Sequence, residues 1–262
     1  MKRLLAGFSC LLVLLIAAPQ AALAHPQDEF CADGSGMDPA LCQELARLDS
    51  ADTKPEDTAG DDRSLKDTVN LDRSPLETAV FYIGIGFQHI LPGGADHILF
   101  VLALFLASTR VRPLLLQISA FTVAHTATLG LTAAGVIAPA GSVVEPLIAL
   151  TIAWAAAENL IFKEMQAWRP LLAFGFGLIH GMGFAGAFGA LGLPQEIFWP
   201  ALIGFNVGVE VGQLSVIGMA LAVSLPVRGI LARAGRKQLY RPLIVLPVSL
   251  LIGVAGLWWA VE

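Results

Sequence analysis

The chain has 262 residues, of which 56% are hydrophobic and only 14% charged, and its formal net charge is −5 at pH 7. This composition excludes a single water-soluble domain and indicates a membrane protein with several crossings. The charge is segregated, because 13 of the 21 acidic residues lie in positions 25–75. The two parts of the chain are therefore expected to lie in different environments.

The first 24 residues have the pattern of a secretory signal peptide. Lys2 and Arg3 precede the apolar run LLVLLIAA, and ALA at 22–24 is a cleavage site of the small-x-small type. We expect cleavage after residue 24, so that residue 25 lies in the periplasm of a bacterial cell. An uncleaved first span is the alternative.

Residues 25–75 are expected to form an acidic periplasmic segment. Cys31 and Cys42 flank the stretch ADGSGMDPAL on the oxidising side of the membrane. We therefore expect a disulfide between them, with a metal-binding thiol pair as the alternative. The low hydrophobicity of the segment predicts a flexible tether with one short helix near PALCQELARL.

Residues 76–262 are expected to form a six-helix transmembrane domain. The apolar segments are 76–108, 113–136, 144–162, 170–191, 197–225 and 242–261. The first is interrupted at Pro92-Gly93-Gly94, and each half is too short to cross a hydrocarbon core near 30 Å thick. Lys and Arg follow the first, third and fifth segments, and the positive-inside rule places all three basic loops in the cytoplasm only if 76–108 crosses once. We therefore predict an all-α polytopic protein of the inner membrane whose first transmembrane helix is broken at membrane depth.

Ionisable side chains recur near the middle of four of these segments. The set is His89, Asp96, His97, His125, His180 and Glu210. A charged group at the bilayer midplane costs several kcal/mol, so such residues are functional by default, although polar contacts between helices are the alternative. Imidazoles and carboxylates without thiols suit Ni²⁺, Co²⁺, Zn²⁺ or Cu²⁺. We predict that the whole set binds one such cation.

Other polar residues share helix faces with this set, at steps of three or four residues. We assign five of them to the support of the site or to the path of the cation: Thr122, Thr128, Asn206, Gln213 and Glu158. Glu158 is nearer the cytoplasmic end. It belongs either to an exit path or to an ion pair with Lys163 or Arg169.

The two halves of the domain resemble each other. GIGFQH at 84–89 matches GFGLIH at 175–180, FTVAH at 121–125 echoes FNVGV at 205–209, and EPLIAL at 145–150 echoes RPLIVL at 241–246. The matches occur in order, 84–96 residues apart. Three spans are an odd number, so the halves have opposite orientation, and the pattern predicts a 3+3 inverted repeat with a site at the midplane.

Five stretches of the domain carry a resemblance to a known family, namely HILPGGADHILFVLAL, FTVAHTATLGL, VEPLIAL, FGLIHGMGFAGA and NVGVEVGQ. Over roughly residues 78–260, they resemble the HupE/UreJ family of bacterial membrane proteins. The resemblance implies a nickel or cobalt permease, or an accessory protein of hydrogenase or urease systems. It also implies that His89, Asp96, His97 and His180 occupy signature positions.

The chain departs from the typical nickel-permease pattern at two places. Six residues rather than five separate His89 from Asp96, and Phe184 stands one turn after His180, where the family pattern has a second histidine. These departures weaken the case for nickel and fit the divergent branch of the family better.

The first functional prediction is a permease that carries a divalent transition-metal cation across the inner membrane, and not an enzyme. The alternatives are an intramembrane zinc-dependent hydrolase, a haem protein with two facing histidines, and an accessory membrane protein. The expected partners are the lipid bilayer, the cation and proteins of metalloenzyme maturation, with no nucleic acid. The sequence does not decide the metal, the direction, the coupling ion or the oligomeric state.

Overall fold

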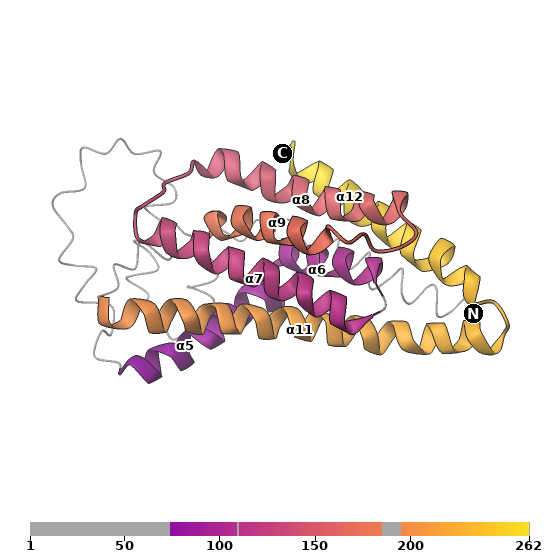
Figure 1. The fold of residues 1–262 in the computed structure, drawn as a ribbon, viewed down its shortest axis with the longest axis horizontal. Helices are drawn as coiled ribbons and strands as arrows, with labels where there is room; N and C mark the ends of the chain where they lie inside the picture. Colours follow the sequence, from indigo (N-terminus) through magenta and orange to yellow (C-terminus); the bar gives the residue numbers. More distant parts are fainter. Residues whose placement is uncertain (1–73, 109, 185–194, 262) are drawn as a thin grey trace.

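The computed structural model describes residues 74–108, 110–184 and 195–261 (Figure 1). The predicted signal peptide and the acidic segment with Cys31 and Cys42 lie outside the described residues. Within the described part, every regular element is helical and none is a strand. The prediction of an all-α protein is therefore confirmed for this part.

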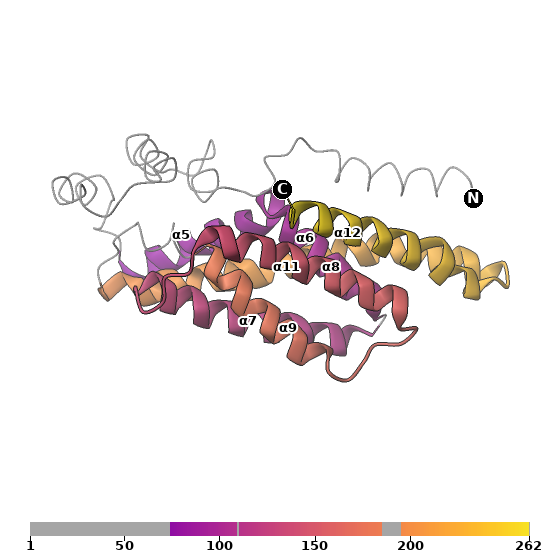
Figure 2. The same cartoon turned by 90° about the horizontal axis from the view of Figure 1, so that it is seen from above.

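The main helices run roughly along the longest axis of the molecule (Figures 1 and 2). They are α5 (Pro75–Gln88), α6 (Ala95–Ala107), α7 (Val111–Ala133), α8 (Gly141–Ile161), α9 (Arg169–Gly183), α11 (Gln195–Arg233) and α12 (Leu246–Trp259). Shorter helical turns occupy His89–Gly93, Lys237–Leu239 and Arg241–Val245.

The first apolar segment is a broken helix, as predicted. A capping box starts α5, because the Ser74 hydroxyl accepts from the backbone N–H of Glu77 at 3.3 Å while the Glu77 carboxylate accepts from the N–H of Ser74 at 2.9 Å. The helical geometry is lost at Leu91 (φ −131°, ψ 112°), and the two halves are bent by 78°. A Cβ at Gly94 would collide with the carbonyl oxygen of His89, so the break requires a glycine there.

The predicted count of six crossings is not confirmed among the described residues. Four helices are long and apolar enough to cross a membrane, namely α7, α8, α11 and the run that ends with α12, and the bent pair α5–α6 adds a fifth if it counts once. The described part of α9 ends at Gly183 after 15 residues, about 22 Å at 1.5 Å per residue. That length is too short to cross a membrane alone, whereas the sequence predicts a span that extends to residue 191.

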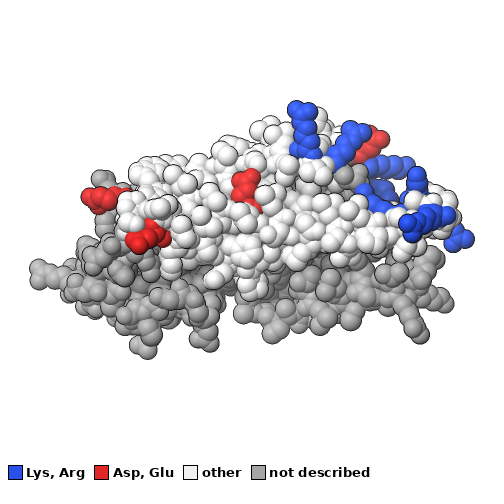
Figure 3. Space-filling view, turned by 90° about the horizontal axis from the view of Figure 1, so that it is seen from below, with Lys and Arg blue, Asp and Glu red and all other residues white. Residues whose placement is uncertain are grey.

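The charges are distributed unequally along the long axis. Lys and Arg gather at one end of the molecule in Figure 3, and two groups of acidic side chains lie at the other end. The chain runs from the acidic end to the basic end through α5 and then α6, and α7 returns (Figure 1). This polarity is the one that the positive-inside rule leads us to expect for a single, bent first crossing.

The packing of the helices bears on the predicted internal repeat, which stays a prediction. The most extensively packed pairs are α5 with α11, α7 with α9, and α8 with α12. The predicted repeat would relate α5 to α9, α7 to α11 and α8 to α12. It would therefore map the α5–α11 pair onto the α7–α9 pair, and the α8–α12 pair onto itself. The same close contact recurs in both halves, because Gly86 lies against the carbonyl of Phe205 and Gly177 lies against the carbonyl of Phe121.

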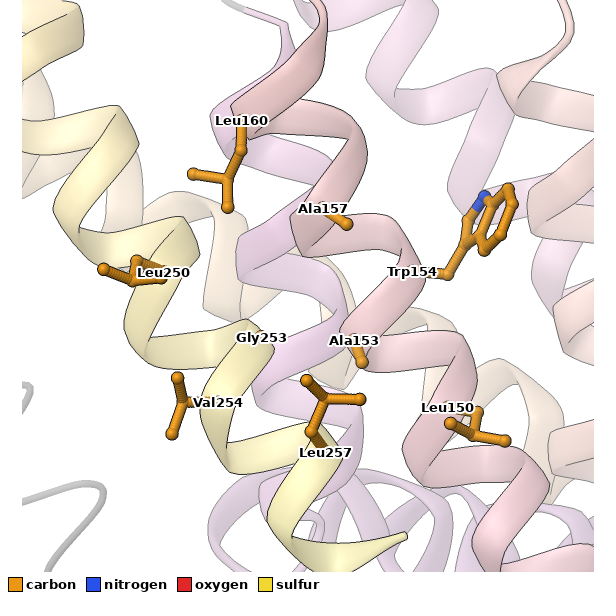
Figure 4. A pocket seen from close by; sticks show the side chains of 9 residues that line it. All are labelled: Leu150, Ala153, Trp154, Ala157, Leu160, Leu250, Gly253, Val254 and Leu257. Atoms are coloured by element: carbon orange, nitrogen blue, oxygen red, sulfur yellow. The ribbon is translucent and has the colours of Figure 1, made fainter.

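The outer surface is apolar, as a lipid-facing surface should be. Large hydrophobic side chains are exposed on several helices, Leu171 at 72% and Trp154 at 58% among them. A groove of about 410 Å³ between α8 and α12 is lined only by apolar residues and glycine (Figure 4). A surface of this kind is stable in hydrocarbon and costly in water.

The paired glycines yield a stability prediction. Gly86→Ala and Gly177→Ala should each lower the free energy of unfolding by about 1–3 kcal/mol or more, because the new Cβ meets a neighbouring carbonyl. The measurement is the apparent melting temperature of the purified protein in detergent. Gly84→Ala and Gly175→Ala are matched controls, since nothing lies within 4 Å of a Cβ there. Equal effects at all four positions would contradict the assigned packing.

Candidate metal centre

Four histidines meet inside the helix bundle. His89 comes from the turn after α5, His97 from α6, His125 from α7 and His180 from α9, and their exposed fractions are 6%, 3%, 0% and 1%. The ring of His97 is central, with centroid distances of 4.6 Å to His89, 5.1 Å to His180 and 6.1 Å to His125. The broken helix thus brings together residues from both sides of its own break.

The ligand atoms form two overlapping groups. His89, His97 and His125 make one, and Asp96, His97 and His180 make the other, with the ligand atoms of each group within 4.8 Å of one another. Two nitrogen ligands of one transition metal lie at most about 4.2 Å apart, since each metal–nitrogen bond is about 2.1 Å. Side-chain rotations would therefore have to draw the ligand atoms of either group closer together for them to coordinate one cation.

His125 is oriented by Asn206 on α11. Its Nδ1 lies 3.0 Å from the Asn206 Oδ1, while the Asn206 amide nitrogen donates to the carbonyl of Leu202 at 2.8 Å. The amide therefore presents its oxygen, so the His125 Nδ1 carries the hydrogen and the lone pair is on Nε2. This Nε2 is buried and has no hydrogen-bond partner in the part of the chain that the structure describes.

His180 is oriented in the same way by Thr151 on α8. The Thr151 hydroxyl donates to the carbonyl of Ile148 at 2.6 Å, so its oxygen accepts from the His180 Nε2 at 2.8 Å. The lone pair of His180 is then on Nδ1, which is buried and lacks a hydrogen-bond partner among the described residues. A hydrogen bond that fixes the tautomer and turns the other nitrogen inward is typical of metal-binding histidines.

Asp96 completes the pattern and is more exposed than the histidine that it contacts. Its Oδ1 accepts from the His97 Nδ1 at 3.0 Å, and its side chain is 18% exposed against 4% for His97. The carboxylate therefore orients His97 and leaves its other oxygen for a ligand. It is also the only acid in the two groups found among the described residues.

Phenylalanine rings enclose the cluster. Phe184 and Phe205 stack on each other at 4.9 Å and lie 4.7 Å and 5.4 Å from the ring of His89. Phe100 and Phe121 lie 5.3 Å and 5.1 Å from the ring of His180. An apolar shell of this kind excludes water and strengthens the electrostatic interactions inside it. The sequence analysis did not predict this role for the four rings.

Glu210, which the sequence placed with the histidines, lies outside both groups of ligand atoms. It accepts a hydrogen bond from the Ser119 hydroxyl at 2.8 Å, and nearby Thr122 donates to the Gln213 Oε1 at 3.1 Å. These polar side chains join α7 to α11, toward the N-terminus of α7 from His125. They continue the polar set toward the basic end of the molecule.

Thr128 has a structural contact instead of a contact with the cluster. Its hydroxyl donates back to the carbonyl of Ala124 at 3.2 Å, on its own helix. A Cβ at Gly181 would collide with this hydroxyl and with the carbonyl of His125. Thr128 therefore lies where α7 and α9 pack closely.

Glu158 takes part in a buried ion pair. Its Oε2 lies 3.3 Å from the Nε of Arg169, and its Oε1 accepts from the indole N–H of Trp168 at 3.0 Å. Arg169 also donates to the Asn159 Oδ1 at 2.9 Å. Of the two roles that the sequence left open for Glu158, the structure shows the ion pair with Arg169.

The part of the sequence that contains these residues matches a known protein family. A family model described as HupE / UreJ protein matches residues 65–262. The chain belongs to the HupE/UreJ family. Membership indicates a membrane protein with a role in metal transport or an accessory role, rather than an enzyme. No curated protein and no solved structure matches the chain.

The ion pair of this HupE/UreJ protein yields a second prediction. Glu158→Gln should lower the free energy of unfolding by on the order of 3 kcal/mol, because it leaves the buried charge of Arg169 unpaired. Melting temperature in detergent measures this effect, and Glu145→Gln, which changes an exposed acid on the same helix, is the control. A Glu158→Gln protein with wild-type stability but impaired metal uptake would instead place Glu158 on an exit path.

Proposed function

We propose that the protein is an inner-membrane permease for a divalent transition-metal cation, Ni²⁺, Co²⁺, Zn²⁺ or Cu²⁺. The ligands are His89, Asp96, His97, His125 and His180. The supporting observation is the orientation of His125 and His180, whose inward nitrogens are buried and have no hydrogen-bond partner among the described residues. An unsatisfied buried polar atom costs about 1–3 kcal/mol, and a bound cation would remove that cost at two of them.

The donor set favours a borderline transition metal over Mg²⁺ or Ca²⁺, which prefer oxygen-only shells. Four neutral imidazoles with one carboxylate leave a divalent cation with a net charge of +1. That charge lies among the four Phe rings, where an uncompensated charge is costly. This cost lowers the affinity for the cation, so that the cation can be released. A permease needs this balance, whereas a structural metal site does not.

The two overlapping groups suggest a route. A cation held by Asp96, His97 and His180 passes to His89 and His125 while His97 stays bound to it, so it is never without ligands. Ser119 on α7 and Glu210 on α11 lie side by side, toward the N-terminus of α7 from His125, and offer oxygen ligands on the way out. The cation thus moves toward the end of the molecule where Lys and Arg gather (Figure 3).

The orientation in the membrane follows from the charges. The acidic segment before α5 lies in the periplasm, and the parts of the chain around Arg110, Arg112, Lys163 and Arg228 lie in the cytoplasm. This arrangement needs six crossings, with α9 and the residues after it as the fourth. The acidic segment then concentrates cations at the outer face.

Transport in proteoliposomes tests the proposal. The wild-type protein should take up at least one of Ni²⁺, Co²⁺, Zn²⁺ and Cu²⁺, and His97→Ala and His180→Ala should each lower that uptake at least about 10-fold because a ligand is lost. Gln117→Leu is the control, since Gln117 is buried and polar but bonds to Pro113 and Met165 rather than to the cluster. Histidine variants that carry every metal as the wild type does would refute the site.

Reporter fusions test the topology. A fusion after Arg112 should be active only with a cytoplasmic reporter, because the bent pair α5–α6 crosses once. A fusion after Ala138, between α7 and α8, should be active only with a periplasmic reporter. Two crossings within 76–108 would exchange both results.

A further inference from the structure

A second polar cavity lies at the basic end of the molecule, away from the histidines. Its volume is about 160 Å³, and it lies between the end of α6, the end of α8, the loop to α9, α11 and the turns before α12. Its charged lining residues are Lys163, Glu164, Arg169, Arg228 and Arg241. Four cations thus surround the cavity with one acid.

The cations of this cavity are only partly neutralised. Arg169 is paired with Glu158. Among the described residues, Arg241 bonds to neutral groups, since its Nη2 donates to the carbonyls of Asn159 at 3.0 Å and Phe162 at 3.1 Å. These carbonyls are at the C-terminal end of α8, where a cation is favoured. Glu164 is therefore the one lining acid that faces the charges of Lys163, Arg228 and Arg241.

Arg228 has an unused donor. The central carbon of its guanidinium lies 4.1 Å from the centre of the Tyr240 ring, which is a cation–π contact. Its Nε is buried and has no hydrogen-bond partner within the described ranges 74–108, 110–184 and 195–261. An unpaired donor on a residue that lines a cavity with four cations and one acid indicates that an acceptor with negative charge belongs there.

The size and lining of the cavity indicate the class of anion. A volume of 160 Å³ holds about five water molecules at about 30 Å³ each, which is enough for a phosphate group. Arginine forks match phosphate oxygens. Leu106, Ala107 and Val245 line the cavity as well, so an apolar group attached to the phosphate would also be in contact.

We infer that this cavity binds the phosphate of an anionic phospholipid. The site is at the end of the apolar helices, at the level of the headgroups, and basic pockets between helices on the cytoplasmic side are typical lipid-headgroup sites. The bound phosphate touches α6 and α8 from the first half and α11 and the turns before α12 from the second. It therefore holds the inner ends of the two halves together, whether or not the histidine cluster carries a metal.

Lipid-dependent thermal stability of the full chain in a neutral detergent tests the inference. Phosphatidylglycerol should raise the apparent melting temperature by about 5 °C or more, and phosphatidylcholine with the same acyl chains should not. Arg228→Gln and Lys163→Gln should each remove more than half of this shift. Arg233→Gln, an exposed charge five residues along the same helix that does not line the cavity, should keep it.

Inorganic phosphate, compared with chloride at equal ionic strength, separates the two sources of phosphate. A lipid site should show little or no shift with inorganic phosphate alone. A full shift with inorganic phosphate that depends on Arg228 would overturn the lipid assignment in favour of a soluble anion. The inference also fails if both lipids act equally, or if all three variants respond as the wild type does. Lys163 is exposed, so Lys163→Gln keeps the test valid even if Arg228→Gln does not fold.

Discussion

The structure depends on one constraint, which is that an interrupted helix inside a membrane must be enclosed by protein. Lipid offers no hydrogen bonds, so the backbone between Leu91 and Gly94 is tolerated only where other helices surround it. Ile90 is fully buried there, and Gly212 of α11 lets that helix approach the Ile90 side chain closely. The same enclosure brings His89 and His97 against α7 and α9, where His125 and His180 lie. The break in the backbone and the cluster of imidazoles thus depend on the same packing of helices.

The cluster is held in place by hydrogen bonds from helices that carry no ligand. Asn206 belongs to α11 and Thr151 to α8, and each fixes the ring of a histidine on a different helix. Movement of α8 or α11 therefore changes the direction in which an imidazole lone pair points. In a permease of the proposed kind, such movement couples the position of the helices to the affinity for the cation.

The sequence predicted the features that depend on depth and composition. The Pro-Gly-Gly break, the helical fold and the meeting of His89, His97, His125 and His180 were predicted, because helix length and midpoint position can be counted. Glu210 shares that depth but bonds to Ser119, since depth does not fix the direction around a helix axis.

Other features could not be predicted, because no local pattern distinguishes them. In the sequence, Thr151 looks like any residue whose hydroxyl bonds to a carbonyl of its own helix, as the Thr128 hydroxyl does. Only the structure shows that the Thr151 hydroxyl also contacts His180. The four Phe rings resemble ordinary core residues. The position of Glu158 in the sequence is compatible with both an exit path and an ion pair. Only the structure shows that the side chain of Arg169 reaches the Glu158 carboxylate.

His97 belongs to both groups of ligand atoms, and one imidazole lone pair serves one metal ion at a time. Two cations therefore exclude each other within this cluster, even though five ligand side chains are present. Different metals would compete for a common occupancy and would not bind cooperatively. In the proposed carrier, His97 would thus limit this cluster to one ion at a time.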